Sequence, residues 1–209
     1  GFEAILFAAM EIKSLESFVA KSLSLPKEAG MSLSKLIASK GCLKILDVSC
    51  NDLGDVGLSN LSGAFSTDHS KVMTKQLLSV VTLSVLDLSY NNLGDAGVLG
   101  LCRGLSQFVR RAASVGVTPA LKVLKLNSNH ITDKAAICLA QLINYRTDPA
   151  GSSGGALSPS PKAGFSNTLH LDELGLNDNP LTGRGIVALL GSANEGVVSP
   201  LKRLHLSNT

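Results

Sequence analysis

The sequence predicts an α/β solenoid, in which one strand and one helix recur along the chain and stack side by side. The first observation is a near-repetition, because LDVSCNDLGDVG occupies residues 46–57 and LDLSYNNLGDAG occupies residues 86–97. The second is the spacing inside each copy, where apolar residues alternate over a few positions and then recur at helical intervals. Segments that agree this closely build the same piece of structure, so the repeat determines the fold class.

The repeated unit begins with the pattern LxxLxLxxNxL, in which valine or isoleucine replaces some leucines. Four complete copies start at Leu43, Leu83, Leu121 and Leu171. Weaker copies start at Leu15 and Leu201, and the first five residues match only the helical end of the unit. We expect a single domain over residues 1–209. Because both ends fall inside a unit, we also expect a fragment of a longer chain.

Each unit is expected to form a strand and then a helix. In the LxL part the two apolar side chains alternate, so both point to one side of a short strand. After Gly97, the residues Leu101, Leu105 and Phe108 follow at spacings that place them on one stripe of a helix. Neither apolar face is buried within its own unit. Stacked units therefore form a parallel sheet, a helical layer and a shared leucine core between them.

The turn between strand and helix carries an asparagine in each complete copy. These residues are Asn51, Asn91, Asn129 and Asn179. Backbone groups are left unpaired where a strand ends, and an inward-pointing amide can bond to them. Asp55 and Asp95 stand near the start of a helix and are expected to cap its N–H groups rather than bind a metal.

Irregular insertions separate several helices from the following strand. Residues 65–82 and 106–120 are expected to lengthen a helix or to add a short one. Residues 147–167 are rich in glycine, serine and proline, a composition typical of a flexible insertion. In solenoids such insertions lie in loops on one face.

The pattern LxxLxLxxNxL resembles the leucine-rich repeat, specifically its long ribonuclease-inhibitor-like subtype. The resemblance implies a horseshoe arc with the parallel β-sheet on the concave face and the helices on the convex face. The same subtype occurs in Ran GTPase-activating proteins, nucleotide-binding immune receptors, tropomodulins and several axonemal subunits. It specifies a fold more closely than a function.

Composition and charge narrow the possible partners. Hydrophobic residues make up 44% of the chain and charged residues 17%, which favours a globular protein. The net charge of +3 is too small and too scattered to indicate nucleic-acid binding. No apolar run approaches the roughly 20 residues of a membrane span. The start of the chain also lacks the basic segment of a signal peptide. We therefore expect a cytoplasmic protein with neither nucleic acid nor membrane as partner.

The four cysteines (Cys42, Cys50, Cys102 and Cys138) are expected to be free thiols. They form no CxxC pair and show no zinc-ligand spacing, which favours reduced thiols and an intracellular location. Cys102 and Cys138 fall on neighbouring helices. Because such helices lie about 8–10 Å apart and a disulfide needs Cα atoms within about 7 Å, we expect this pair to be too far apart to bond.

No arrangement of residues indicates catalysis, a metal or a cofactor. His69, His130, His170 and His205 fall in different parts of the chain, without partners at metal-ligand spacing. There is no GxSxG motif, and GRGIVALLG at residues 183–191 lacks the GK[ST] of a phosphate-binding loop. We expect a protein that is not an enzyme and takes no cofactor and no small-molecule substrate.

The expected function is that of a protein–protein interaction module or scaffold in a larger intracellular complex. A cytoskeletal or axonemal assembly is favoured, which would place the chain at the cytoskeleton or in a cilium or flagellum. Two alternatives stay open: a GTPase-activating protein of the Ran type, and the ligand-sensing end of a nucleotide-binding immune receptor. Insertions as irregular as these fit the first alternative poorly.

The expected binding surface is the concave face. Residues between the core leucines point away from the helices, and together they form a column that turns from acidic to mixed and basic along the chain. The candidate residues are Asp47, Asp87, Tyr90, Lys122, Lys125, Asp172, Glu173, Lys202, Arg203 and His205. The inserted loops are the alternative binding surface.

Overall fold

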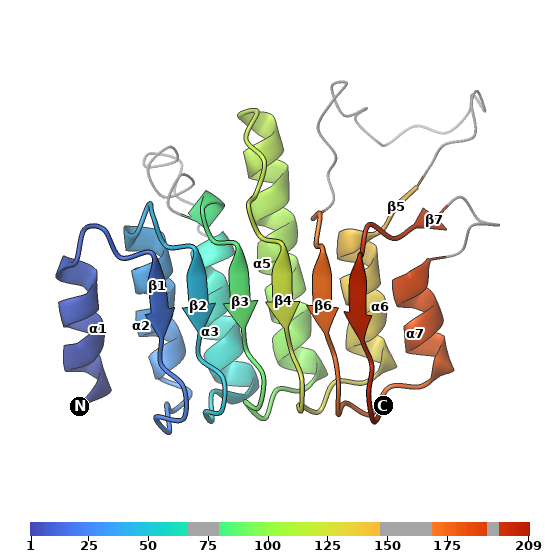
Figure 1. Ribbon diagram of the computed structural model, residues 1–209, viewed down its shortest axis with the longest axis horizontal. Helices are drawn as coiled ribbons and strands as arrows, with labels where there is room; N and C mark the ends of the chain where they lie inside the picture. The colour runs from blue at the N-terminus through green and yellow to red at the C-terminus, as the bar shows by residue number, and fades with distance from the viewer. Residues whose placement is uncertain (67–79, 147–168, 192–196) are drawn as a thin grey trace.

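The computed structural model describes residues 1–66, 80–146, 169–191 and 197–209, which alternate between strands and helices (Figure 1). The helices are α1 (Phe2–Glu11), α2 (Ala29–Ser39), α3 (Gly54–Ser66), α5 (Asp95–Ser114), α6 (Asp133–Ile143) and α7 (Gly183–Leu190). The main strands are β1 (Ser17–Val19), β2 (Ile45–Asp47), β3 (Val85–Asp87), β4 (Val123–Lys125), β6 (Glu173–Gly175) and β8 (Arg203–His205). Two short strands, β5 (Tyr145–Arg146) and β7 (Val197–Val198), pair antiparallel.

The main strands form one open sheet in the order β1-β2-β3-β4-β6-β8, and every neighbouring pair is parallel. The helices lie behind this sheet in Figure 1, and no helix of the described residues covers its other face. The predicted fold class, an α/β leucine-rich-repeat solenoid, is confirmed. We call the uncovered sheet face the concave face.

The register places the same repeat position side by side on every strand. Leu46 pairs with Leu86, Leu86 with Leu124, and Leu124 with Leu174. All four side chains are fully buried between the sheet and the helices. One apolar cluster runs from Leu6 to Leu189, so the repeats share a single core.

Helix α5 is longer than its neighbours because it takes up one insertion. It has 20 residues, against 11 in α6, and its last buried residue is Ala112. The prediction that residues 106–120 lengthen a helix is therefore confirmed. The insertion at 65–82 lies mostly outside the described residues, and the one at 147–167 lies wholly outside them.

The repeated asparagines hold the turns together, as predicted. The Asn129 Oδ1 accepts hydrogen bonds from the N–H groups of Asn91 and Leu93, both at 3.0 Å. Its Nδ2 donates to the carbonyl oxygens of Leu88 and Leu126. Equivalent bonds are made by Asn51, Asn91 and Asn179. Each asparagine thus joins its own turn to the turn of the preceding repeat.

The aspartates near the helix starts bond across repeats, which corrects their expected role as caps of their own helices. Asp55 accepts the Gly94 N–H at 2.7 Å. Asp95 accepts both the N–H and the hydroxyl of Thr132. Asp133 accepts the same two groups of Thr182, and the Thr182 hydroxyl lowers the pKa of the Asp133 carboxyl. These carboxylates connect consecutive repeats.

Two of the cysteines lie on neighbouring helices. Cys102 on α5 and Cys138 on α6 are free thiols. Both side chains line one surface pocket formed by residues of the two helices. The expected helix separation concerned the axes, whereas both side chains extend into the space between them.

Candidate functional site

The concave face carries two columns of side chains, one on each side of the buried leucine column. Because alternate residues of a strand point to opposite faces, the first and third residues of each strand face away from the helices. The first column is Ser17, Ile45, Val85, Val123, Glu173 and Arg203. The second column is Val19, Asp47, Asp87, Lys125, Gly175 and His205.

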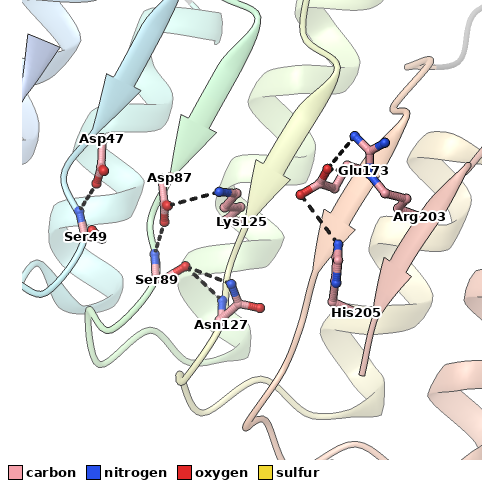
Figure 2. Close-up of polar contacts among 9 residues, drawn as sticks. All are labelled: Asp47, Ser49, Asp87, Ser89, Lys125, Asn127, Glu173, Arg203 and His205. Carbon is pink, nitrogen blue, oxygen red and sulfur yellow. Dashed lines mark hydrogen bonds and ion pairs between the residues drawn. The ribbon is translucent and has the colours of Figure 1, made fainter. Parts of the chain in front are cut away.

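The C-terminal half of this face is a network of paired charges (Figure 2). The Glu173 Oε2 accepts a hydrogen bond of 2.7 Å from the Arg203 Nε, and its Oε1 lies 3.5 Å from the His205 Nε2. The hydrogen bond from Arg203, with smaller effects of nearby positive charges, lowers the pKa of the Glu173 carboxyl. Beside them the Lys202 ammonium lies 3.1 Å from the Asp172 carboxylate.

The N-terminal half has fewer paired charges and more exposed apolar surface. In the first column Ile45 is 38% exposed and is followed by the half-buried Val85 and Val123, and in the second column Val19 is 60% exposed. Aliphatic side chains with this exposure on a sheet face are the kind of surface that protein partners cover.

The two aspartates of the N-terminal half also close their own turns. The Asp47 Oδ1 accepts the Ser49 N–H at 2.9 Å, and the Asp87 Oδ1 accepts the Ser89 N–H at 3.0 Å (Figure 2). Asp87 additionally lies 3.9 Å from the Lys125 ammonium. Asp47 has no such cationic partner among the described residues, so its carboxylate is the less neutralised of the two.

Tyr90 projects from the end of β3 because of an unusual backbone conformation. Its φ of 56° is left-handed, and its own N–H and C=O groups are both bonded to neighbouring turns. The equivalent position is left-handed in the other repeats as well: Ser22, Cys50, Ser128, Asp178 and Asn208. Tyr90 is the aromatic residue among these six, and its ring is 56% exposed.

A row of polar side chains at the strand exits is a feature that sequence reasoning missed. The Ser89 Oγ accepts hydrogen bonds from the N–H and the side-chain amide of Asn127 (Figure 2). The Asn127 Oδ1 accepts the Asn177 N–H, and the Asn177 Oδ1 accepts the Ser207 N–H. The sequence signal was present, because serine or asparagine follows the strand in each of these repeats.

The structure therefore brings together some of the predicted site residues and separates others. Asp87, Lys125, Glu173, Arg203 and His205 form one charged band, with Asp47 and Tyr90 on its N-terminal side. Three candidates precede the strands instead: Lys122, whose ammonium donates to the His170 carbonyl, and the ion pair of Asp172 and Lys202. These three lie at the rim of the concave face.

The arrangement is not that of a metal centre. Among the residues that the structure describes, no group of three or more His, Cys, Asp or Glu side chains is placed to hold a metal ion. In the same described residues, no helix is long and apolar enough to cross a membrane.

Comparison with known proteins identifies the repeats. Residues 42–62, 81–102 and 119–140 match the family model described as Leucine Rich repeat. No curated protein matches the sequence. A solved structure titled "Leiomodin-1 Actin-Binding Site 2 (ABS2)" is similar, with a TM-score of 0.51, 14% sequence identity, and coverage of 84% of this chain and 78% of that one. At this identity the likeness concerns the fold.

Proposed function

Because this chain is a leucine-rich-repeat protein, we propose that it is a protein-interaction module whose partner lies against the N-terminal half of the concave face. The site consists of Val19, Ile45 and Tyr90, with the carboxylates of Asp47 and Asp87 beside them. The charged band around Glu173 borders it.

The observation that carries this proposal is the exposure of Val19, Ile45 and Tyr90 on a sheet face that no described helix covers. Removing apolar surface from water favours protein association, and tyrosine is enriched among the residues that contribute most to binding. The charges of the C-terminal half are already neutralised within the chain, so they contribute less to affinity.

Charge indicates the kind of partner that fits. Asp47 and Asp87 place two carboxylates beside the apolar column, and the only cation near them in the described structure is Lys125. A partner segment that combines apolar and basic side chains is complementary to this surface. The carboxylates would mainly determine orientation and association rate, because exposed charges act chiefly in those ways.

We further propose that the partner belongs to a cytoskeletal assembly, which places the chain in the cytoplasm, at the cytoskeleton or in a cilium or flagellum. What supports this is the likeness in fold to a structure whose title names an actin-binding site. Actin filaments are therefore the first probe. Co-sedimentation of the purified chain with filaments is the expected result. Failure to sediment would remove actin as the partner without testing the binding face.

The binding face is tested by two matched triple variants. Val19→Thr, Ile45→Thr and Tyr90→Asn remove apolar surface from the concave face while keeping β-branching in the strands and a residue that tolerates the left-handed turn. The control changes Met31→Gln, Val56→Thr and Val187→Thr, which are 55%, 56% and 62% exposed on helices α2, α3 and α7.

Both variants are compared with the original chain in quantitative capture from cell extract. We expect recovery of the specific partner to fall at least about tenfold with the concave-face variant, as loss of a hot spot implies, and to stay unchanged with the helix-side variant. Equal recovery with both would contradict the proposal. A chain lacking residues 150–163 tests the inserted loop as the alternative surface. GTP hydrolysis by a small GTPase, with and without the chain, tests the GTPase-activating alternative.

A further inference from the structure

The helix side of the solenoid holds a pair of thiols that the proposed binding function does not use. Cys102 on α5 is only 2% exposed, whereas Cys138 on α6 is half-buried. Both side chains line one surface pocket formed by the two helices, and each thiol affects the pKa of the other. One member of the pair is therefore more open to solvent reagents than the other.

A surface pocket opens onto this pair. It has a volume of about 420 Å³ and is lined by both cysteines together with Arg103, Gln107 and Arg110. Two guanidinium groups beside a thiol make the surroundings electropositive, which favours the thiolate, the form of cysteine that reacts with oxidants.

The environment divides the two thiols into different roles. The hydrogen bond with Cys102 and the charge of Arg103 outweigh partial burial and lower the pKa of Cys138 to about 7. The same contact with Cys138, together with burial, raises the pKa of Cys102. The accessible thiol is thus the more acidic of the two, and the buried thiol is the less acidic.

We propose that Cys138 is a modification site for small peroxides and that Cys102 is its resolving partner, so that oxidation joins helices α5 and α6 by a disulfide. In the first step the Cys138 thiolate attacks one oxygen of the peroxide, the O–O bond breaks, and Cys138 becomes a sulfenic acid. For hydrogen peroxide, the leaving hydroxide takes up a proton to form water.

In the second step the Cys102 sulfur attacks the Cys138 sulfur. An S–S bond forms, the S–O bond breaks, and water leaves with the proton of the Cys102 thiol. Two electrons have then passed from the two thiols to the peroxide. Because both sulfurs line the same pocket, the Cys102 thiol is available to the sulfenic acid within the same chain.

The experiment is oxidation of the folded, fully reduced chain with substoichiometric hydrogen peroxide, followed by mass spectrometry of unreduced peptides. The expected product is a Cys102–Cys138 disulfide, with the loss of two hydrogen atoms, while Cys42 and Cys50 stay reduced as internal controls. Disulfides that involve Cys42 or Cys50 instead, or oxidation of all four cysteines at one rate, would overturn the proposal.

Two variants separate the roles. Cys102→Ala keeps an apolar side chain in the buried site and should accumulate a sulfenic acid at Cys138, which dimedone traps. Cys138→Ser changes the half-buried site and should leave Cys102 unoxidised. If Cys102→Ala traps no sulfenic acid although its thermal melt shows a folded chain, Cys138 is not the reactive thiol. If the unsubstituted chain yields a sulfenic acid but no disulfide, Cys102 is not the resolving thiol.

The pH dependence of alkylation reports the pKa of Cys138, and a pair of cysteines with a purely structural role would not require that pKa to be lowered. The rate of iodoacetamide labelling at Cys138 should rise with pH around a midpoint near the pKa of about 7. Arg103→Gln removes an exposed charge and should shift this midpoint upward. A midpoint that matches those of Cys42 and Cys50 and does not respond to Arg103→Gln would contradict the assignment.

Discussion

At the residue scale, polar side chains that look like surface features hold the repeats in register. The amide of Asn91 donates to the Val48 carbonyl of the preceding repeat and to its own turn, and its side chain is fully buried. Removing one partner from a buried hydrogen bond leaves the other unsatisfied, and that penalty exceeds the net value of the bond. The asparagine row is therefore more important to stability than its polarity suggests.

We predict that Asn91→Ala lowers the free energy of unfolding by roughly 1–3 kcal/mol. Asn92 is the matched control, because its exposed amide bonds only to the Asp52 carboxylate among the contacts described. Since Asn92 has a left-handed φ of 53°, the control is Asn92→Gly, which keeps that conformation accessible. Urea melts that show equal losses at the two positions would contradict the assigned register.

A second prediction concerns Glu173, whose pKa is lowered chiefly by the Arg203 hydrogen bond. A carboxyl whose pKa is depressed in the folded state stabilises the fold above its unfolded pKa, and this contribution is lost as the pH falls through its folded pKa. Arg203→Gln should therefore raise the Glu173 pKa, measured by NMR titration. It should also weaken the loss of stability on acidification. An unchanged Glu173 titration would show that the ion pair does not persist in solution.

At the element scale, the close approach of neighbouring helices depends on glycine at particular places. A Cβ on Gly30 of α2 would meet the Gly57 carbonyl oxygen of α3 and lie 2.9 Å from the Gly57 Cα. A Cβ on Gly63 of α3 would find only the Ser34 Oγ, at an ordinary 3.6 Å. The neighbouring helix thus leaves room for a Cβ atom at Gly63 and not at Gly30.

Gly30→Ala should destabilise the chain by about 1–3 kcal/mol, because backbone atoms cannot move aside as a flexible side chain can. Gly63→Ala should be neutral or stabilising by up to about 1 kcal/mol, since alanine has the higher helix propensity and no contact opposes it. Thermal and urea melts of the two variants provide the comparison. Similar losses in both would mean that helix packing is looser than the structure indicates.

At the scale of the whole molecule, the sequence predicted the solenoid because the same residues in each repeat determine both the local structure and the packing of the core. The spacing around Leu46 and Leu86 identifies both the strand position and the core face, and the asparagine position identifies the turn. When the same residues specify local structure and core packing, the fold can be predicted from a single sequence.

The candidate site could be predicted from the sequence less completely than the fold, for physical reasons. Which charges neutralise one another depends on the register between strands that are far apart in the sequence, as for Asp87 with Lys125 and Glu173 with Arg203. Nor could the sequence show that Cys102 and Cys138 line one pocket, because helix spacing does not determine where two side chains point. Local pattern identifies which residues face one side, and only the assembled sheet shows which of them remain unpaired.

The central claim, that the partner lies against the N-terminal half of the concave face, is tested most directly by site-specific photo-crosslinking. A photo-reactive benzoylphenylalanine is placed at Val19 of β1 or, as the control, at Met31 of α2, two positions that are 60% and 55% exposed. We expect the captured partner to crosslink to position 19 and not to position 31. Crosslinking from position 31 with none from position 19 would contradict it.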